Sequence, residues 1–400
     1  MLTQLEMRKG ALLVGAATFL FWLSLYFYVP ILPLHARDLG ATNTMVGAVV
    51  AAYAIGQVLL RIPIGVGADI IGRRKPFAVA AFVASGIGAL WLALSPSPLS
   101  LFFARSVTGI AGAGWVAISV LYASYFSTGR TAGAMSRIMA INGLGLVLAT
   151  FSGGLIADAI GTLATFYAGL AAAVAGMALL LMAPEPPMEN RARYSMTTFI
   201  TVAKTRLLLM VSAMSVVAHY VTFASTFGFV PMYAEDIGAS KAEVGYVTTV
   251  VFVTSVAGTL LAPMVVRRLG YASALVIASV IIGGSIAIIP AIGDVASLAG
   301  SQAVGGLGRG LLYAMLMTLA VLSVPPAQRA TAMGLFQAIY AIGMLIGPVA
   351  SGAIADGAGI DTVFYVAAAV SVGGSALVVF LRVPDDWGRA PQTAGHRRGG

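Results

Sequence analysis

The sequence predicts an all-α integral membrane protein with twelve transmembrane helices arranged as two pseudo-symmetric six-helix bundles. Three observations support this fold class: an apolar composition, a series of long uncharged segments and an internal repeat. Hydrophobic residues make up 59% of the 400 residues and charged residues only 9%, whereas soluble globular proteins have about 45–50% apolar and about 25% charged residues. The mean hydropathy of +0.95 excludes a water-soluble fold. The apolar segments are long and continuous, which favours helices over the alternating strands of a membrane β-barrel.

Stretches that lack Asp, Glu, Lys and Arg place the transmembrane helices. About 20 residues cross the hydrocarbon core. Twelve segments reach this length when Arg61, Arg105, Arg137 and Arg309 are allowed inside helices or at their ends. The predicted spans are 11–34, 44–66, 77–95, 98–122, 134–157, 162–183, 207–232, 243–265, 272–292, 296–322, 330–355 and 361–382.

The basic residues of the loops predict the orientation of the chain. With the N-terminus inside, eighteen of the 23 Lys and Arg residues lie on the cytoplasmic side and two, Arg37 and Lys241, on the outer side. The other three, Arg61, Arg105 and Arg309, fall inside the spans. Cytoplasmic loops carry such an excess of positive charge, so we expect a multi-pass protein of the cell (cytoplasmic) membrane with both termini in the cytoplasm. The net charge of +9 is then a topology signal and gives no reason to expect nucleic-acid binding.

A comparison of the two halves reveals a repeat at a constant offset of 198 residues. Residues 33–47 match 231–245 at seven of fifteen positions, and residues 156–167 match 354–365 at six of twelve. The repeat predicts a bundle over 1–183, a cytoplasmic linker over 184–206, a second bundle over 207–382 and a cytoplasmic tail over 383–400. Two parallel repeats of this kind enclose a site near the bilayer midplane and rock about it, which predicts a transporter that works by alternating access.

The loop between the second and third predicted spans carries the most specific motif, Gly65-Val66-Gly67-Ala68-Asp69-Ile70-Ile71-Gly72-Arg73-Arg74-Lys75. From the residues alone, glycine permits close helix approach and a tight turn, and the basic residues anchor the topology. The segment closely resembles the Gly-x-x-x-Asp-x-x-Gly-Arg-Lys/Arg-Lys/Arg signature of the major facilitator superfamily, which lies in the same loop. The resemblance implies the fold of that superfamily, secondary transport, and a contact from Asp69 to the eleventh span that latches the two halves on the cytoplasmic side.

Further motifs resemble those of this superfamily and of its drug:proton antiporter branch. Arg105-x-x-x-Gly109-x-x-Gly112 in the fourth span resembles the arginine motif of the superfamily, and Pro30-Ile31-Leu32-Pro33 in the first span resembles the Pro-x-x-Pro of the branch. The eleventh span carries Gly343-x-x-x-Gly347-Pro348, which resembles the fifth-span motif of the branch at the repeat-equivalent position. In the fifth span Ala149-Thr150 replaces the Gly-Pro pair of the branch motif. The resemblance implies a proton-coupled antiporter for multidrug efflux. We expect gating or conformational roles for Gly65, Asp69, Gly72, Arg73, Arg74, Gly347 and Pro348.

Polar and aromatic side chains deep in the spans are candidates for a central substrate site, because polar groups there are costly and usually functional. The predicted substrate-binding residues are Tyr26, Tyr53, Gln57, Arg105, Trp115, Asn142, His219, Gln302, Arg309, Tyr313, Gln337 and Tyr340. Gln57 and Asn142 have the alternative of bonding only a neighbouring helix. We expect Arg61 to extend to the cytoplasmic surface, and Tyr28 and Tyr233 to anchor the spans at the membrane interface.

None of the fourteen acidic residues lies in the middle of a span. The candidates for proton coupling are Asp38, His219 and Asp236. Deep arginines attract carboxylate or phosphate groups, so two hypotheses stay open. The first is a proton-coupled exporter of amphipathic drugs or metabolites. The second is a carrier of organic or inorganic anions that uses Arg105 and Arg309.

Several function classes are excluded by composition. The chain has no cysteine and three histidines, which excludes disulfides, thiolate metal sites and a histidine-rich metal site. No phosphate-binding loop or catalytic triad is visible, so we expect neither an enzyme nor a cofactor. The expected partners are a small-molecule substrate, a gradient of protons or another ion, and membrane lipids. We expect a monomer.

Overall fold

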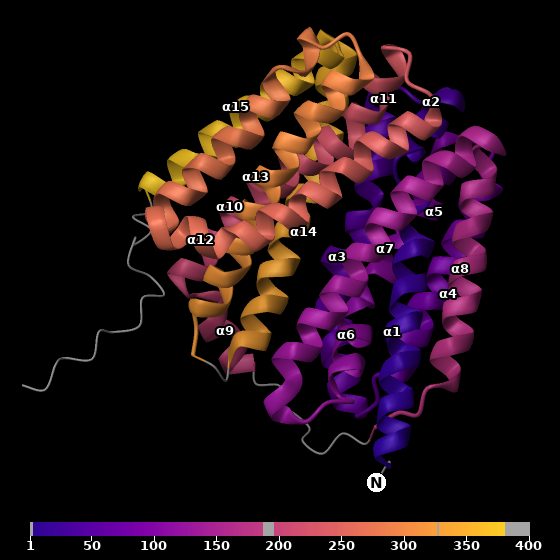
Figure 1. The fold of residues 1–400 in the computed structure, drawn as a ribbon, viewed down its shortest axis with the longest axis vertical. Helices are drawn as coiled ribbons and strands as arrows, with labels where there is room; N and C mark the ends of the chain where they lie inside the picture. The colour runs from indigo at the N-terminus through magenta and orange to yellow at the C-terminus, as the bar shows by residue number, and fades with distance from the viewer. Residues whose placement is uncertain (1–2, 187–195, 326–327, 381–400) are drawn as a thin grey trace, which may run out of the picture.

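The computed structural model describes residues 3–186, 196–325 and 328–380 and consists of helices joined by short connections (Figure 1). Eleven of the described helices are long and apolar enough to cross a membrane. One of them, Lys241–Ala291, has 51 residues and contains two of the predicted spans, so the twelve-helix fold is confirmed. The predicted tail (383–400) and residues 187–195 of the predicted linker lie outside the described residues.

The helices fall into two sets of similar order. The first half contains α1 (Gln4–Tyr26), α2 (Leu32–Asp38), α3 (Asn43–Ile71), α4 (Lys75–Ala93), α5 (Pro98–Ala113), α6 (Trp115–Ala123), η1 (Thr128–Arg130), α7 (Thr131–Ala159) and α8 (Thr162–Met182). The second half contains α9 (Met196–Ala203), α10 (Arg206–Ala224), η2 (Ser225–Phe229), α11 (Val230–Asp236), α12 (Lys241–Ala287), η3 (Ile289–Ala291), α13 (Val295–Leu322), α14 (Arg329–Ala358) and α15 (Ile360–Phe380).

Several spans are interrupted where the sequence suggested continuous helices. The first span stops at Tyr26 and resumes at Leu32, after a turn that contains Pro30, which lacks the N–H that a helix needs. The seventh span contains η2, a π-helical segment. By contrast, the break in the merged helix α12 at Gly270, which has φ 77° and ψ 168°, falls between the predicted eighth and ninth spans and interrupts neither.

The backbone reproduces the repeat of the sequence. Six described glycines have positive φ, and they form three pairs separated by 198 residues. The pairs are Gly40/Gly238, Gly72/Gly270 and Gly161/Gly359. Because positive φ favours glycine, the same turn is built at the same point of each half. This agreement of geometry and offset supports the duplicated architecture.

The two halves meet on one side of the molecule and diverge on the other (Figure 1). We call the side that carries Asp38, Asp236 and Asp356 the acidic side, and the side that carries Arg73 and Arg74 the basic side. In Figure 1 the halves approach each other near α2 and α11 and separate toward the N-terminus. The structure is therefore closed on the acidic side.

Two helix crossings close the acidic side, one between α3 and α14 and one between α7 and α12. A Cβ atom on Gly47 of α3 would overlap the carbonyl oxygen of Pro348 in α14. A Cβ atom on Gly245 of α12 would lie 2.6 Å from the Cα atom of Gly154 in α7. Glycine at these positions lets the backbones touch, and Gly47 and Gly245 are equivalent in the repeat.

Polar contacts join the halves on the same side. The carboxylate of Asp356 accepts hydrogen bonds from the backbone N–H groups of Asn43 and Thr44, both at 2.9 Å, and from the Thr44 hydroxyl at 2.6 Å. Arg37 forms ion pairs with Glu235, its repeat equivalent, and with Asp236, the latter at 2.7 Å.

The α7/α12 crossing has its own pair of contacts. The hydroxyls of Thr150 and Thr249 lie 2.9 Å apart, and Lys241 Nζ donates to Thr162 Oγ1 at 2.8 Å. Both contacts run between the two halves. They add to the glycine packing, so each crossing combines close backbone approach with polar bonds.

Candidate functional site

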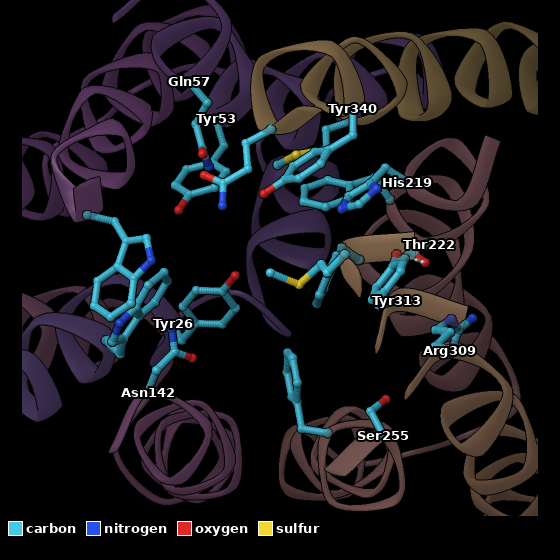
Figure 2. A pocket seen from close by; sticks show the side chains of 18 of the residues that line it. Tyr26, Tyr53, Gln57, Asn142, His219, Thr222, Ser255, Arg309, Tyr313 and Tyr340 are labelled. Carbon is cyan, nitrogen blue, oxygen red and sulfur yellow. Dashed lines mark hydrogen bonds between the residues drawn. The ribbon is translucent and has the colours of Figure 1, made fainter. Parts of the chain in front are cut away.

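A central cavity of about 280 Å³ lies between the two halves (Figure 2). Ten of the twelve predicted substrate-binding residues line it, namely Tyr26, Tyr53, Gln57, Trp115, Asn142, His219, Arg309, Tyr313, Gln337 and Tyr340. Met139 and Met317 also line the cavity and are 40% and 38% exposed. They belong to the basic-side portions of α7 and α13, so the cavity opens toward the basic side. The role of these residues in substrate binding stays a prediction.

Aromatic rings form much of the first-half wall. Trp22 packs edge-on against Trp115 with ring centroids 5.2 Å apart, and Tyr26 lies 5.7 Å from Trp22. Tyr26 also meets Phe252 of the second half at 5.9 Å. Such rings offer large apolar contact area together with polar edges. The cavity can therefore accommodate an apolar or aromatic body.

Arg105 and Gln302 lie behind the cavity wall, unlike the other ten predicted residues. Arg105 is buried beside a smaller void next to Tyr26 and Tyr53. Its guanidinium carbon lies 4.5 Å from the ring centroid of Tyr53 and 5.6 Å from that of Tyr28. Gln302 is fully buried in α13. The prediction that these two side chains line the main cavity is thus wrong in this conformation, because neighbouring helices cover them.

The arginine motif of α5 forms a seat for Tyr53. A Cβ atom on Gly109 would overlap the backbone of Tyr53, and one on Gly112 would overlap its ring. Arg105 stacks on the face of that ring, where a cation is attracted by the π electrons. The motif spacing therefore brings α5 against α3 and holds Tyr53 at the cavity wall.

Arg61 does not extend to the surface, so the sequence prediction for it is wrong. Its side chain lines the cavity and is 5% exposed. Nη1 donates a hydrogen bond to the Tyr340 hydroxyl at 3.1 Å, which joins α3 of the first half to α14 of the second. The reason is that α3 continues to Ile71, beyond the predicted end of the span. Arg61 therefore lies deeper than the sequence suggested.

Tyr28 and Tyr233 are not exposed anchors at the membrane interface, in contrast to the prediction. Tyr28 is fully buried and its ring faces Arg105. Tyr233 is also buried, and its hydroxyl donates to the carbonyl oxygen of Ile292 at 2.8 Å. Both follow the interruption of a span, at the turn before α2 and within α11, where the chain packs against its own half.

His219 of α10 is held in a stack of aromatic rings (Figure 2). Its ring centroid lies 3.9 Å from that of Tyr340 with an angle of 2° between the planes, and 4.8 Å from that of Tyr313 with an angle of 18°. Nδ1 lies 2.8 Å from the carbonyl oxygen of Ser215. A carbonyl oxygen only accepts, so we assign the proton to Nδ1. Through Tyr340 the stack is bonded to Arg61 of the other half.

The other two candidates for proton coupling lie far from this stack in the fold. Asp38 and Asp236 are exposed at the ends of α2 and α11, on the acidic side. Asp236 is paired there with Arg37. Of the three candidates, only His219 is among the residues that line the cavity.

The predicted gating residues at the basic end of α3 behave differently from one another. Gly72 ends the helix in the left-handed conformation with φ 74°, as expected for a tight turn. Asp69 Oδ1 lies 3.7 Å from Arg74 Nη2 of its own half, and its contact with the eleventh span stays a prediction. Gly65 marks no close approach here, since a Cβ atom would lie 3.6 Å from Val116. The gating role of Gly65 stays a prediction.

Glu185 is a partner of this loop that sequence reasoning missed. Its Oε1 accepts hydrogen bonds from the backbone N–H groups of Arg74 at 2.7 Å and Lys75 at 2.9 Å, and Oε2 accepts from Arg73 Nε at 3.2 Å. A carboxylate at a helix N-terminus satisfies free N–H groups and is favoured by the helix dipole. The start of the predicted linker is therefore hydrogen-bonded to the loop that contains Arg73, Arg74 and Lys75.

The cavity also contains residues outside the predicted set. They are Trp22, Arg61, Met139, Thr222, Phe223, Phe227, Val251, Phe252, Ser255, Met317 and Met344. The repeat contained a signal for three of them, because Met139, Val251 and Ser255 are equivalent to Gln337, Tyr53 and Gln57. The apolar members resemble ordinary core residues in sequence. Only the meeting of two bundles identifies them as cavity walls.

Comparisons with known proteins identify one family. The family model described as Major Facilitator Superfamily matches residues 14–233 and 212–398. The chain is 24% identical over 391 residues to an uncharacterized MFS-type transporter of Methanocaldococcus jannaschii. This alignment covers 94% of this chain and 99% of the relative. It is 23% identical over 189 residues to the quinolone resistance protein NorA of Staphylococcus aureus, covering 47% of this chain and 48% of NorA. A solved bacterial homolog of the human lysosomal transporter Spinster, in an inward-facing and occupied conformation, matches with a TM-score of 0.79 at 14% identity over 93% of this chain and 96% of that one.

Proposed function

The chain belongs to the major facilitator superfamily, and we propose that it exports an amphipathic drug or metabolite in exchange for protons. The central cavity carries this proposal. Its wall combines the rings of Trp22, Trp115 and Phe252 with polar side chains such as Gln57 and Asn142. A ligand with an apolar body and a few polar groups is complementary to such a surface. We take the protein to act as a monomer.

The closed acidic side supports an alternating-access cycle. In this conformation Gly47 and Gly245 hold the crossings together, while the cavity opens toward the basic side. The basic side is the cytoplasmic one if the excess of Lys and Arg sets the orientation. Substrate then enters from the cytoplasm, and rocking of the halves opens the acidic side for release.

We assign the binding of the exchanged proton to His219. It is the cavity-lining side chain whose usual pKa places its charge change near neutral pH, and the cavity-lining residues include no Asp or Glu. A proton on Nε2 would make the ring a cation stacked against the faces of Tyr313 and Tyr340. The branch motifs support exchange with protons, and the similarity to the quinolone resistance protein NorA over about half of its length supports a drug-like substrate.

A second candidate is a carrier for organic or inorganic anions. The charged residues that line the cavity are Arg61 and Arg309, both positive. A carboxylate or phosphate on the substrate would be held by bidentate hydrogen bonds from a guanidinium. Arg105, which sequence reasoning assigned to this role, is stacked on Tyr53 instead.

Proton movement in inverted vesicles tests the proposal. An acid-inside gradient is followed with a quenched pH dye, and lipophilic cations, neutral aromatic compounds, carboxylates and phosphates are added separately. We expect amphipathic compounds to release protons and His219→Gln to abolish this release. His35→Gln, which changes a histidine outside the cavity, is the matched control and should keep it. A response to anions alone, lost in Arg61→Gln, would establish the second candidate; wild-type proton release by His219→Gln would remove the assigned proton site.

A further inference from the structure

Three arginines lie inside the spans, and the structure accommodates them differently. Arg105 is sandwiched against the rings of Tyr53 and Tyr28. Arg61 donates to the Tyr340 hydroxyl and lies 5.9 Å from the centroid of that ring. Each of these two cations is thus partly stabilised by π electrons. Arg309 has no ring face and no carboxylate beside it within residues 3–186, 196–325 and 328–380.

Arg309 is the most deeply buried of the three. Arg309 is 2% exposed. Its Nη2 donates a hydrogen bond to Ser225 Oγ at 3.3 Å. Nε and Nη1 are buried without a hydrogen-bond partner. Figure 2 shows the guanidinium at the edge of the cavity and directed away from its open centre, toward the helices of the second half.

An unpaired guanidinium in this position is energetically unfavourable. Arginine keeps its proton at all accessible pH values, so the group cannot become neutral. Burial of an isolated charge costs several kcal/mol, and a buried cation is normally paired with an anion. The unpaired nitrogens Nε and Nη1 therefore identify a position where a negative ligand would be strongly favoured.

Neighbouring groups form a corner around the Arg309 guanidinium and supply further donors. Gly305 lies one turn before Arg309 in α13, and a Cβ atom there would lie 3.5 Å from Arg309 Nη1 and 2.6 Å from Ser285 Oγ. Glycine at this position lets the Ser285 side chain approach α13 beside the guanidinium. Gln302, one further turn along the same face, is fully buried with both amide atoms unpaired.

The other side of the corner is the π-helical segment η2. Ser225, which contacts Arg309, is the first residue of η2, and the hydroxyl of the adjacent Thr226 is buried without a partner. Such π-helical insertions are frequent at functional sites. A regular helix would shift these hydroxyls by one position, so the insertion determines what faces the guanidinium.

We propose that Arg309 is the centre of an anion-binding site between η2 and α13, reached from the central cavity. The site takes one small negative group, either a free halide such as chloride or the carboxylate of a molecule bound in the cavity. Nε and Nη1 of Arg309 donate to it, and the unpaired amide of Gln302 supplies a further donor.

Thermal unfolding of the purified chain in lipid nanodiscs tests the site without any transport. Sodium is held constant while chloride replaces isethionate, a bulkier sulfonate that has no carboxylate, up to 300 mM, and sodium benzoate is tested in a second series. A ligand that binds only the folded state raises the unfolding midpoint, and we expect a rise of at least about 2 °C. Arg309→Gln should remove the rise, whereas Arg105→Gln should keep it.

Each outcome decides the proposal. A rise with chloride that Arg309→Gln loses identifies a free anion, and a rise with benzoate alone that this variant loses identifies a carboxylate of a cavity ligand. If Arg309→Gln does not fold, Arg309→Lys, which keeps the charge but not the planar fork, should respond more weakly than the wild type. Equal responses of the Arg309 variants and the wild type, or no response of the wild type to either anion, would overturn the site. The vesicle assay on proton release can fail or succeed independently of this result.

Discussion

The two helix crossings on the acidic side occupy equivalent positions of the repeat but are held by different chemistry. At the α3/α14 crossing, Gly47 meets the carbonyl oxygen of Pro348. At the α7/α12 crossing, Gly245 lies over Thr150, the equivalent of Pro348, and the Thr150 hydroxyl bonds to Thr249 at 2.9 Å. The altered antiporter motif of the fifth span thus supplies a hydroxyl bond between the halves.

The carboxylates of the two crossings differ as well. Asp356 accepts hydrogen bonds from the first N–H groups of α3 and from the Thr44 hydroxyl. At the other crossing the residue equivalent to Thr44 is Ala242, which has no hydroxyl for Asp158. The comparison teaches that glycine contact is the shared element of closure, while the polar bonds are local additions. Disruption of the shared element should therefore have the largest effect.

Gly245→Ala should have the largest effect on the closed state. The new Cβ would lie 2.6 Å from Gly154 Cα and 2.8 Å from the Thr150 carbonyl oxygen, and both are backbone atoms that cannot rotate away. Overpacking costs about 1–3 kcal/mol, which lowers the ratio of closed to open molecules about 5- to 150-fold. Thiol labelling of a single cysteine on the acidic side measures this change, because the chain has no native cysteine.

Gly284→Ala is the matched control for this substitution. Gly284 is also in α12, and nothing lies within 4 Å of a Cβ atom there. We expect wild-type labelling and transport. An equal loss of the closed state in both variants would mean that the flexibility of α12, and not backbone contact at the α7/α12 crossing, explains the result.

Asp356→Ala should have an intermediate effect. Loss of an N-terminal cap typically costs about 1 kcal/mol, and here the cap joins two halves, so closure should weaken about fivefold. Asp158→Ala, the equivalent change at the other crossing, should alter acidic-side labelling much less. Identical labelling in these two variants would contradict the asymmetry of the crossings.

Thr150→Val should have the smallest effect. It removes the bond to Thr249, but Thr249 keeps its hydrogen bond to the Gly245 carbonyl oxygen at 2.7 Å. We expect a loss of about 0.5 kcal/mol, at the low end for a hydrogen bond, and so about a twofold change in labelling. A loss as large as that of Gly245→Ala would show that the hydroxyls, and not the glycines, carry the closure.

Much of the fold could be predicted because membrane helices follow composition closely. In lipid every backbone group must be satisfied within the segment, so long apolar stretches can only be helices. The offset of 198 residues found in the sequence also relates the turns that the structure shows at Gly72 and Gly270. The ends of helices were less certain, since α3 extends to Ile71 and carries Arg61 into the cavity. The linker and tail boundaries stay predictions.

The site was less accessible from the sequence because it forms between two bundles. Polarity and position within a span identified Tyr53, His219 and Arg309 as cavity residues. The same criteria selected Arg105 and Gln302, which neighbouring helices cover, since sequence spacing gives a helix face but not what packs on it. The π-helical segment that meets Arg309 has no sequence signal that we recognise.

Distances between spin labels on opposite sides of the molecule test alternating access most directly. Cysteines at the repeat-equivalent positions Ala159 and Gly357 report on the acidic side, and cysteines at Ile71 and Leu269 report on the basic side. Each pair has one label in each half. In nanodiscs, ligand and a change of pH should populate a second state in which the acidic-side distance is longer and the basic-side distance is shorter. Distances that stay fixed, or that lengthen together, would contradict a transporter that exposes its cavity to one side at a time.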